Sequence, residues 1–301
     1  MTKKTTNLLG IIITILAGTY FYITCCSECG MSSKKEPDKE VMAPVADEAT
    51  SYPFAFSEDE FAYSANNNFN FNPSSSTILL PVTQDIEDGI GRLNSFLTEN
   101  SNKVVDVTGY YKSDEENDSA FPNLGLARAN AVKNYFVSKG IPSRLINIYG
   151  TLKNELVPKG NIYLGPLGYN LTERPEDADD KLKALYNRIN SNPLTLKFNT
   201  AEASINLSSE QRQKFADIST YLDKVEGATA NVVGHTDNTG QRATNIALGQ
   251  ERADFAKAYM MRNGISESKI NATSKGPDEP LVSNATEEGK AQNRRTVITL
   301  N

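Results

Sequence analysis

The sequence predicts an α+β protein in which one two-layer unit, a β-sheet backed by helices, occurs twice after an N-terminal transmembrane helix. Three observations predict this fold. Blocks of sequence repeat in the same order, predicted strands and one-sided helices alternate within each copy, and a long uncharged stretch lies near the start. The chain has 301 residues, 39% of them hydrophobic and 23% charged, which is typical of globular proteins.

The uncharged stretch runs from Leu8 to Cys26. A helix of this length rises about 28 Å at about 1.5 Å per residue, enough to cross the hydrocarbon core of a bilayer. Lys3 and Lys4 precede it, so the positive-inside tendency places the N-terminus in the cytoplasm. We therefore expect residues 1–30 to be a membrane anchor, favouring a single-pass anchor in the inner membrane. The alternatives are a cleaved signal peptide and outer-membrane association after lipoprotein processing at Cys25, although Tyr22-Ile23-Thr24 matches such a cleavage site poorly.

The three cysteines, Cys25, Cys26 and Cys29, lie within five residues, so the rest of the chain has no thiol for a disulfide or a nucleophile. The cluster lacks a fourth zinc ligand, and we expect no metal and no cofactor. Residues 31–67 are rich in Ser, Pro, Asn and acidic residues and are predicted to be a flexible linker. Four aromatic residues indicate that part of this linker lies on a folded domain: Phe54, Phe56, Phe61 and Tyr63.

The internal repeat consists of three paired blocks. The pairs are Phe71–Ile78 with Phe198–Ile205, Val104–Tyr110 with Ala230–His235, and Leu124–Ile141 with Leu248–Ile265. Such a repeat indicates a duplicated domain. We call residues 68–172 copy one and residues 193–301 copy two; residues 173–192 form a charged connector that is expected to be partly helical.

Copy two shows the element order most clearly. Residues Ser208–Gln211 form a capping-box pattern, and Phe215, Ile218, Leu222 and Val225 follow at helical spacing. A short apolar strand is predicted at Ala230–Gly234. The next helix is expected to begin near Asn245 and end at Gly264, and a final strand is predicted at Arg294–Leu300.

Copy two also contains GHTDNTG (234–240), LGxxRA (248–253), GI (264–265) and NRR (293–295) in that order. This arrangement resembles the OmpA-like domain, also called the OmpA/MotB C-terminal domain; the resemblance is strong over copy two and weaker over copy one. It implies a βαβαβ sandwich that binds peptidoglycan without covalent chemistry, through the diaminopimelate of the stem peptide.

The resemblance assigns the ligand to Asp237 and Arg252. Diaminopimelate carries an ammonium and a carboxylate on one carbon, which suit an Asp and a planar Arg fork respectively. We expect Arg252 in the first turns of its helix, where the helix N-terminus would also favour the carboxylate. The resemblance further implies that the same pocket includes Thr236, Asn245 and either Arg294 or Arg295.

Local structure offers a simpler reading of the same residues. An Asp in a TDNTG turn often accepts backbone N–H groups, an Arg in a first helical turn is often a solvated surface group, and Asn245 could be only a helix cap. His235, the single histidine, is expected to pack at a strand end.

Copy one keeps the matching arginine, Arg128, but the position fifteen residues earlier is Ser113, beside Lys112. A lysine there would repel the ligand ammonium. We therefore expect copy one to retain the fold and to have lost this ligand. Its role stays open between a spacer, a dimerisation element and a surface for envelope protein partners.

Composition limits the function classes. A net charge of −6 with no long basic run argues against nucleic acid as a partner. The chain has one histidine and no cysteine beyond Cys29, which argues against most nucleophilic and metal-dependent mechanisms of a wall hydrolase. Acidic residues are plentiful, so residue counts do not exclude a mechanism that uses two carboxylates. The leading hypothesis is a non-catalytic tether between a membrane and the peptidoglycan of the cell envelope, with the folded domains in the periplasm. The alternative is an adaptor subunit of an envelope machine, such as a secretion or stator-like complex, that the wall immobilises.

Overall fold

The computed structural model describes residues 15–20, 22, 48–197 and 206–301. The chain divides into Met1–Asp47 and a compact unit from Glu48 to Asn301. Residues 15–20 are helical, but no helix within the described residues is long and apolar enough to cross a membrane. Most of the predicted anchor, the three cysteines and the linker up to residue 47 lie outside the described residues. In the described part of the chain, no group of three or more His, Cys, Asp or Glu could hold a metal ion.

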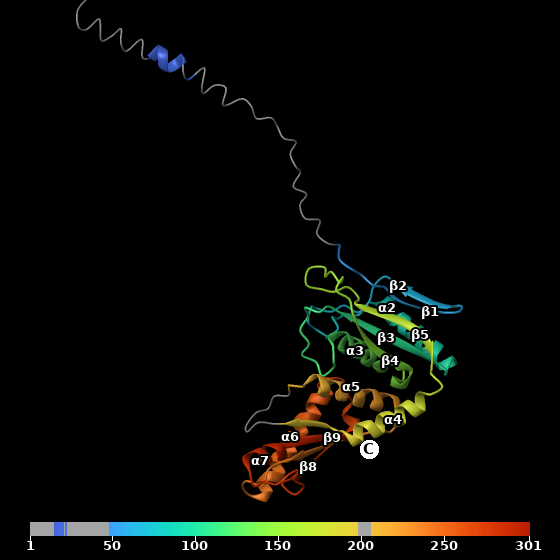
Figure 1. Ribbon diagram of the computed structural model, residues 1–301. Helices are drawn as coiled ribbons and strands as arrows, with labels where there is room; N and C mark the ends of the chain where they lie inside the picture. Colours follow the sequence, from blue (N-terminus) through green and yellow to red (C-terminus); the bar gives the residue numbers. More distant parts are fainter. Residues whose placement is uncertain (1–14, 21, 23–47, 198–205) are drawn as a thin grey trace, which may run out of the picture. The chain divides into compact units, whose positions relative to one another are not determined.

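Copy one is built on a three-stranded sheet of order β4-β3-β5 (Figure 1). Strand β3 (Lys103–Tyr111) is parallel to β4 (Ile146–Leu152) and antiparallel to β5 (Leu167–Glu173). The helices of this copy are α2 (Gln84–Glu99) and α3 (Leu124–Ser138), with a 3₁₀ turn, η3 (Ser143–Leu145), before β4. Both α-helices contribute buried side chains to the apolar cluster that includes Val105 and Val107 of β3. Copy one therefore has the predicted two-layer form.

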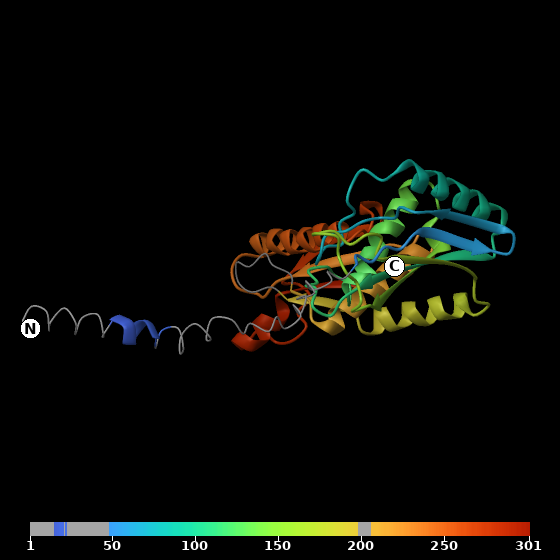
Figure 2. The same cartoon turned by 90° about the horizontal axis from the view of Figure 1, so that it is seen from above.

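The flexible linker predicted over residues 31–67 is wrong from Thr50 onward, whereas the expectation that its aromatic residues lie on a folded domain is confirmed. Strands β1 (Phe54–Glu58) and β2 (Phe61–Ala65) form an antiparallel hairpin, which Figures 1 and 2 show in blue. Phe54 and Phe56 belong to the core of copy one, and the ring of Phe54 packs edge-on against Tyr169 of β5. Burial of these aromatic rings is favourable enough to order a segment whose composition otherwise resembles a linker.

Copy two has a four-stranded sheet of order β6-β9-β7-β8. Strand β7 (Ala230–His235) is parallel to β8 (Ile270–Gly276) and antiparallel to β9 (Arg295–Leu300), and β9 is antiparallel to β6 (Leu194–Lys197). The helical elements are α5 (Ser209–Lys224), α6 (Arg242–Arg262), the 3₁₀ turn η4 (Glu267–Lys269) and α7 (Glu287–Asn293). Residues 198–205, the copy-two partner of the repeat block Phe71–Ile78, lie outside the described residues.

The local signals of copy two give mixed results. The capping box is confirmed, because Ser208 accepts from the Gln211 amide and the Gln211 side chain accepts from the Ser208 amide. Gly264 is confirmed as the residue after the C-cap, with φ +92°. The start of α6 at Asn245 is wrong: α6 begins at Arg242, and the Asn245 amide bonds the carbonyl of Gln241 within the first turn. A polar residue inside the first turn is easily taken for the cap itself.

The connector contains the expected helix, α4 (Ala178–Ser191). Its buried Ile189 belongs to the apolar cluster of copy two, and the side chain of Asn190 bonds both the N–H and the C=O of Leu300. The connector is therefore packed on copy two rather than free between the copies.

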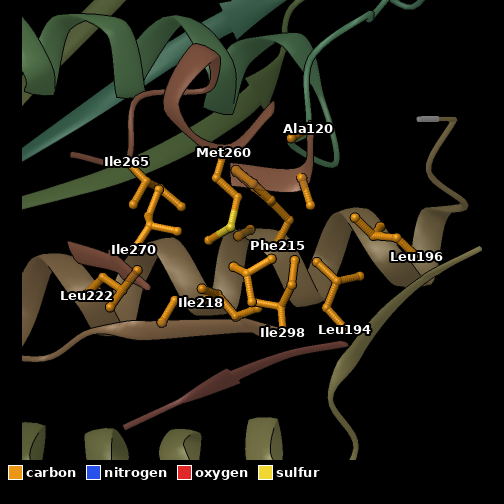
Figure 3. Close-up of a cluster of buried hydrophobic side chains, with 14 of the residues drawn as sticks. Ala120, Leu194, Leu196, Phe215, Ile218, Leu222, Met260, Ile265, Ile270 and Ile298 are labelled. Carbon is orange, nitrogen blue, oxygen red and sulfur yellow. The ribbon is translucent and has the colours of Figure 1, made fainter. Parts of the chain in front are cut away.

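Each copy has its own apolar cluster, and part of copy one also packs into the cluster of copy two. Ala120, Phe121, Leu124 and Ala127 of copy one belong to the same buried cluster as Phe215 and Met260 of copy two, and Figure 3 shows Ala120 beside these side chains. Phe121 and Phe215 pack edge to face at 5.5 Å. Across the same boundary, the buried Lys133 of copy one pairs with Asp223 of copy two.

Candidate functional site

Two glycines place Arg252 at the end of strand β7. A Cβ atom on Gly234 of β7 would lie 1.8 Å from the carbonyl oxygen of Gly249 in α6, so only glycine allows helix and strand to approach this closely. Arg252 lies three residues after Gly249, on the same helical face. Its Nη1 donates to the carbonyl of His235 at 3.0 Å, and the residue is 8% exposed.

Arg252 lies in the middle of α6, ten residues after the helix begins, and not in its first turns as the sequence suggested. The dipole field falls off within one turn of the terminus, so the helix start gives no special support to an anion at this side chain. Burial lowers the pKa of Arg252, as does the charge of Arg294, while Asp237 opposes the shift. The charges of Asp237, Arg252 and Arg294 therefore act on one another.

Asp237 lies in the loop between β7 and α6. Its Oδ1 accepts the amide N–H of Thr239 at 2.8 Å, and its Oδ2 accepts from Nη1 of Arg294 at 2.8 Å. Burial alone would raise the pKa of Asp237, but the bonds from Arg294 and Thr239 outweigh it and lower that pKa. Asp237 therefore accepts a backbone N–H within the TDNTG turn, as its local sequence suggested, and its carboxylate also forms an ion pair with Arg294.

Thr236 and Asn245 are buried, and their bonds hold the loop that carries Asp237. The amide of Thr236 donates to the carbonyl of Gly276 at 2.9 Å, and its hydroxyl donates to the carbonyl of Asp237 at 2.9 Å. Nδ2 of Asn245 donates to the carbonyl of Thr239 at 3.0 Å. The bonds of both residues position the loop.

The three residues of the NRR motif, Asn293, Arg294 and Arg295, have different roles. Arg294 pairs with Asp237, whereas the guanidinium of Arg295 turns to the carbonyls of Glu279 and Asn293. Asn293 is fully buried and fixes the loop after β8, because its amide group bonds the N–H groups of Leu281 and Val282 and the carbonyl of Val282. Of the two predicted arginines, Arg294 joins the site and Arg295 supports the neighbouring loop.

Sequence reasoning left Asn293 without a role, although its place in NRR was visible. An Asn at the end of the short helix α7, two residues before the final strand, can hold the preceding loop, since its side chain offers two donors and an acceptor.

His235 is 4% exposed, and burial together with the charge of Arg295 lowers its pKa to about 4. It is neutral at pH 7 and packs at the strand end as expected. Three side-chain atoms near this strand end are buried and have no hydrogen-bond partner in the described part of the chain. They are Nδ1 of His235, Nε of Arg294 and Oγ1 of Thr296. Three orphaned polar atoms at the ends of β7 and β9 are unusual, because buried polar atoms are normally satisfied by protein, water or ligand.

The corresponding place in copy one has the same scaffold. A Cβ on Gly109 of β3 would lie 1.9 Å from the carbonyl oxygen of Gly125, and Nη1 of Arg128 donates to the carbonyl of Tyr110 at 2.8 Å. Arg128 is fully buried. The glycine pair and the arginine therefore recur as one unit in both copies.

The two copies differ in the carboxylate that lies near this arginine. Glu115, thirteen residues before Arg128, binds both Nη atoms of Arg128, at 2.5 and 3.1 Å. Nε and Nη2 of Arg128 also donate to the carbonyls of Ser75 and Asn72. These bonds use all five donors of the guanidinium. Counting fifteen residues back to Ser113 missed Glu115, because the loop of copy one is longer and its carboxylate enters from another position.

The two arginines of the copy-two site bring positive charge beside one carboxylate. A site with both signs of charge at the end of two strands suits a zwitterionic ligand, with its carboxylate at the guanidinium groups and its ammonium at Asp237. Copy one presents a closed ion pair at the same place.

Comparison with known proteins agrees with this repeated geometry. The family model described as OmpA family matches residues 70–160 and 198–294. The chain is 31% identical over 144 residues to the "Probable lipoprotein YiaD" of Escherichia coli, covering 45% of this chain and 65% of that protein. It is 39% identical over 74 residues to the "Peptidoglycan-binding protein ArfA" of Mycobacterium bovis, covering 25% of this chain and 23% of that protein.

Among solved structures, the peptidoglycan-associated lipoprotein from Burkholderia pseudomallei is 24% identical, with a TM-score of 0.32 over 36% of this chain and 89% of that chain. The chain spans less than two thirds of the length of both relatives named above. The two segments that the family model matches together cover more than half of the chain, one in each sheet-and-helix copy, and the chain therefore belongs to the OmpA family.

Proposed function

We propose that this protein is a non-catalytic peptidoglycan-binding protein of the cell envelope, and that copy two holds the wall through the diaminopimelate of the stem peptide. The observation that carries the proposal is the charged constellation of Asp237, Arg252 and Arg294 at the ends of β7 and β9. A relative named for peptidoglycan binding supports peptidoglycan as the ligand.

Each residue has a proposed role. Arg252 and Arg294 bind the carboxylate of diaminopimelate, and Asp237 binds its ammonium, since charge-assisted bonds are the strongest that such a ligand can form. Thr236 and Asn245 hold the loop of Asp237, and Arg295 holds the loop after β8. The side chain of Asp237 is 13% exposed and that of Arg294 is 20% exposed, so a ligand has direct access to both charges.

The membrane connection is part of the proposal. The uncharged stretch Leu8–Cys26 supports a tether in which residues 1–30 hold a membrane and copy two holds the wall. We favour a single-pass inner-membrane anchor with the folded unit in the periplasm; a lipid on Cys25 and outer-membrane association is the alternative. Detection of an N-terminal acyl group by mass spectrometry would favour the alternative.

A second candidate is the adaptor subunit of an envelope machine. It is favoured by copy one, which keeps the scaffold while Glu115 fills its arginine site. Copy one would then bind a protein partner while copy two immobilises the assembly. Crosslinking of the full chain in cells, with wall binding removed by Asp237→Asn, distinguishes the two. An adaptor keeps a defined protein partner, and a simple tether does not.

The main test is co-sedimentation of the full chain with purified sacculi. We expect Asp237→Asn and Arg252→Lys to reduce the bound fraction strongly, and free diaminopimelate to compete for the parent protein. Arg262→Ala is the matched control, because it removes a guanidinium from the same helix outside the site. Sedimentation of both site variants at the parent level, with the fold intact by circular dichroism, contradicts the site assignment. Release of soluble wall fragments by the purified protein contradicts the non-catalytic role.

A further inference from the structure

A cavity of about 430 Å³ lies where the connector helix α4 meets both copies. Its walls come from the start of β3, the residues around β4, the segment from Arg174 to Leu185, and the C-terminal half of α5. This volume falls within the range of about 300–1,000 Å³ that is usual for small-molecule sites, which often form where domains meet. The cavity is distant in sequence from the wall-binding loop and shares no residue with it.

The charge of the cavity is opposite to that of the chain. Four cations line it, Arg144, Arg174, Lys181 and Lys224, and none of the described residues that line it carries a carboxylate. The whole chain has a net charge of −6. Asp179 pairs with Arg174 at 2.5 Å and Asp177 pairs with Lys181 at 2.9 Å, but these aspartates are 81% and 57% exposed, and solvent weakens such pairs.

Lys224 is the most enclosed of the four cations. Its Nζ donates to the carbonyls of Arg144 and Ile146 at 3.0 and 2.7 Å, and an ammonium has three donors. Burial lowers the pKa of Lys224 to about 8; Lys133 adds to this shift and Asp223 opposes it. A cation that the protein itself stabilises poorly gains the most from an added anion.

The remaining wall is apolar. Leu182 and Leu185 of α4 face the cavity together with Val104 and Leu145 of copy one, and Tyr149 adds a half-exposed ring. Inorganic anions gain nothing from such a wall. The combination favours a ligand that has an anionic head and a short apolar body, because both parts are then removed from water in favourable contact.

We propose that this cavity binds a small amphiphilic anion, a phosphate monoester or carboxylate on a short alkyl chain. Lys224 and Arg144 bind the head, and Leu182 and Leu185 contact the chain. Because α4 and both copies contribute to the wall, the bound ligand also stabilises the junction between them. The site is independent of wall binding.

The test uses the full chain in a non-ionic detergent and three probes: hexyl phosphate, inorganic phosphate and hexanol. Binding is measured by NMR of protein labelled with ¹³C-lysine, in which the Cε signal of Lys224 also reports the titration of its unmodified ammonium. We expect hexyl phosphate to bind at least about tenfold more tightly than either other probe and to raise the pKa of Lys224, because an anion favours the charged form.

Three variants sharpen the test. Lys224→Met removes the buried charge, Ala178→Phe fills the cavity from α4 without changing any charge, and Lys183→Met removes a charge from α4 outside the cavity. The first two should each weaken hexyl phosphate binding about tenfold or more, and the third should leave it unchanged. Equal binding of all three probes, or parent-level binding by both Lys224→Met and Ala178→Phe, overturns the proposal.

Discussion

Copy one and copy two place an arginine at the same point of the same scaffold and use it differently. In copy one, Glu115 from the adjacent loop grips Arg128, and the side chains of both residues are at most 3% exposed. In copy two, the loop carboxylate of Asp237 is paired with Arg294 from the strand β9 side, and both of these side chains reach solvent. The difference shows that the origin of one carboxylate decides whether the charged side chains are enclosed, as in copy one, or reach solvent, as in copy two.

The largest expected effect follows from the closed pair in copy one. Arg128→Ala leaves Glu115 buried without its partner, and removal of one member of a buried pair costs about 3–5 kcal/mol of the free energy of unfolding. Asp237→Ala, which removes the more exposed carboxylate of copy two, should cost markedly less. Urea unfolding of both full-chain variants measures the difference, and equal losses would contradict the comparison.

Asn293→Ala tests whether the loop after β8 supports the copy-two site. The variant removes the hydrogen bonds from this side chain to Leu281 and Val282, and we expect a loss of about 1–3 kcal/mol in unfolding free energy together with weaker sacculus binding. Asn284→Ala, which removes only a half-buried partner of Asn293, is the control. Unchanged wall binding in a destabilised Asn293→Ala would confine this residue to stability.

Arg294→Ala tests the electrostatics of Asp237. The parent pKa lies below the ordinary 3.8, so the ion pair stabilises the folded state above that pH and this contribution is lost as the pH falls through the folded-state pKa. Burial raises the pKa of Asp237 and Arg294 lowers it, so the pKa should rise when Arg294 is removed. Carboxyl ¹³C NMR of parent and variant measures it; an unchanged pKa would mean that Arg294 does not hold the carboxylate.

A further pH-dependent effect is expected at His235. Its pKa is lowered to about 4 in the folded state from an ordinary 6.5, so its contribution to stability is present above pH 6.5 and declines as the pH falls toward 4. In His235→Gln the unfolding free energy should therefore fall less over this range than in the parent.

Much of the fold followed from short-range signals. Ser208 and Gln211 formed their cap, Gly264 ended α6, and Phe215 and Leu222 faced the core, because capping and helical periodicity act over a few residues. The hairpin β1–β2 did not follow, since its order depends on contacts of Phe54 with β5 more than a hundred residues away.

The site was predicted in part. The positions of Asp237 and Arg294 could be read from motifs, but their direct pairing joins residues 57 positions apart and no local pattern encodes it. Glu115 was not predicted, because the loop of copy one is longer. Its carboxylate therefore lies at a different sequence spacing from Arg128 than Asp237 has from Arg252. Spacing rules transfer between copies only where loop length is conserved.

The most direct test of the account is an NMR titration of the full chain with a stem peptide that contains diaminopimelate, followed at backbone amides. We expect shifts at Asp237 and Thr239 and in the neighbouring strand ends of copy two, with none at Tyr110 or Lys112 of copy one. A peptide with lysine in place of diaminopimelate, which lacks the second carboxylate, should bind more weakly. Shifts centred on copy one, or equal binding of the two peptides, would contradict the account.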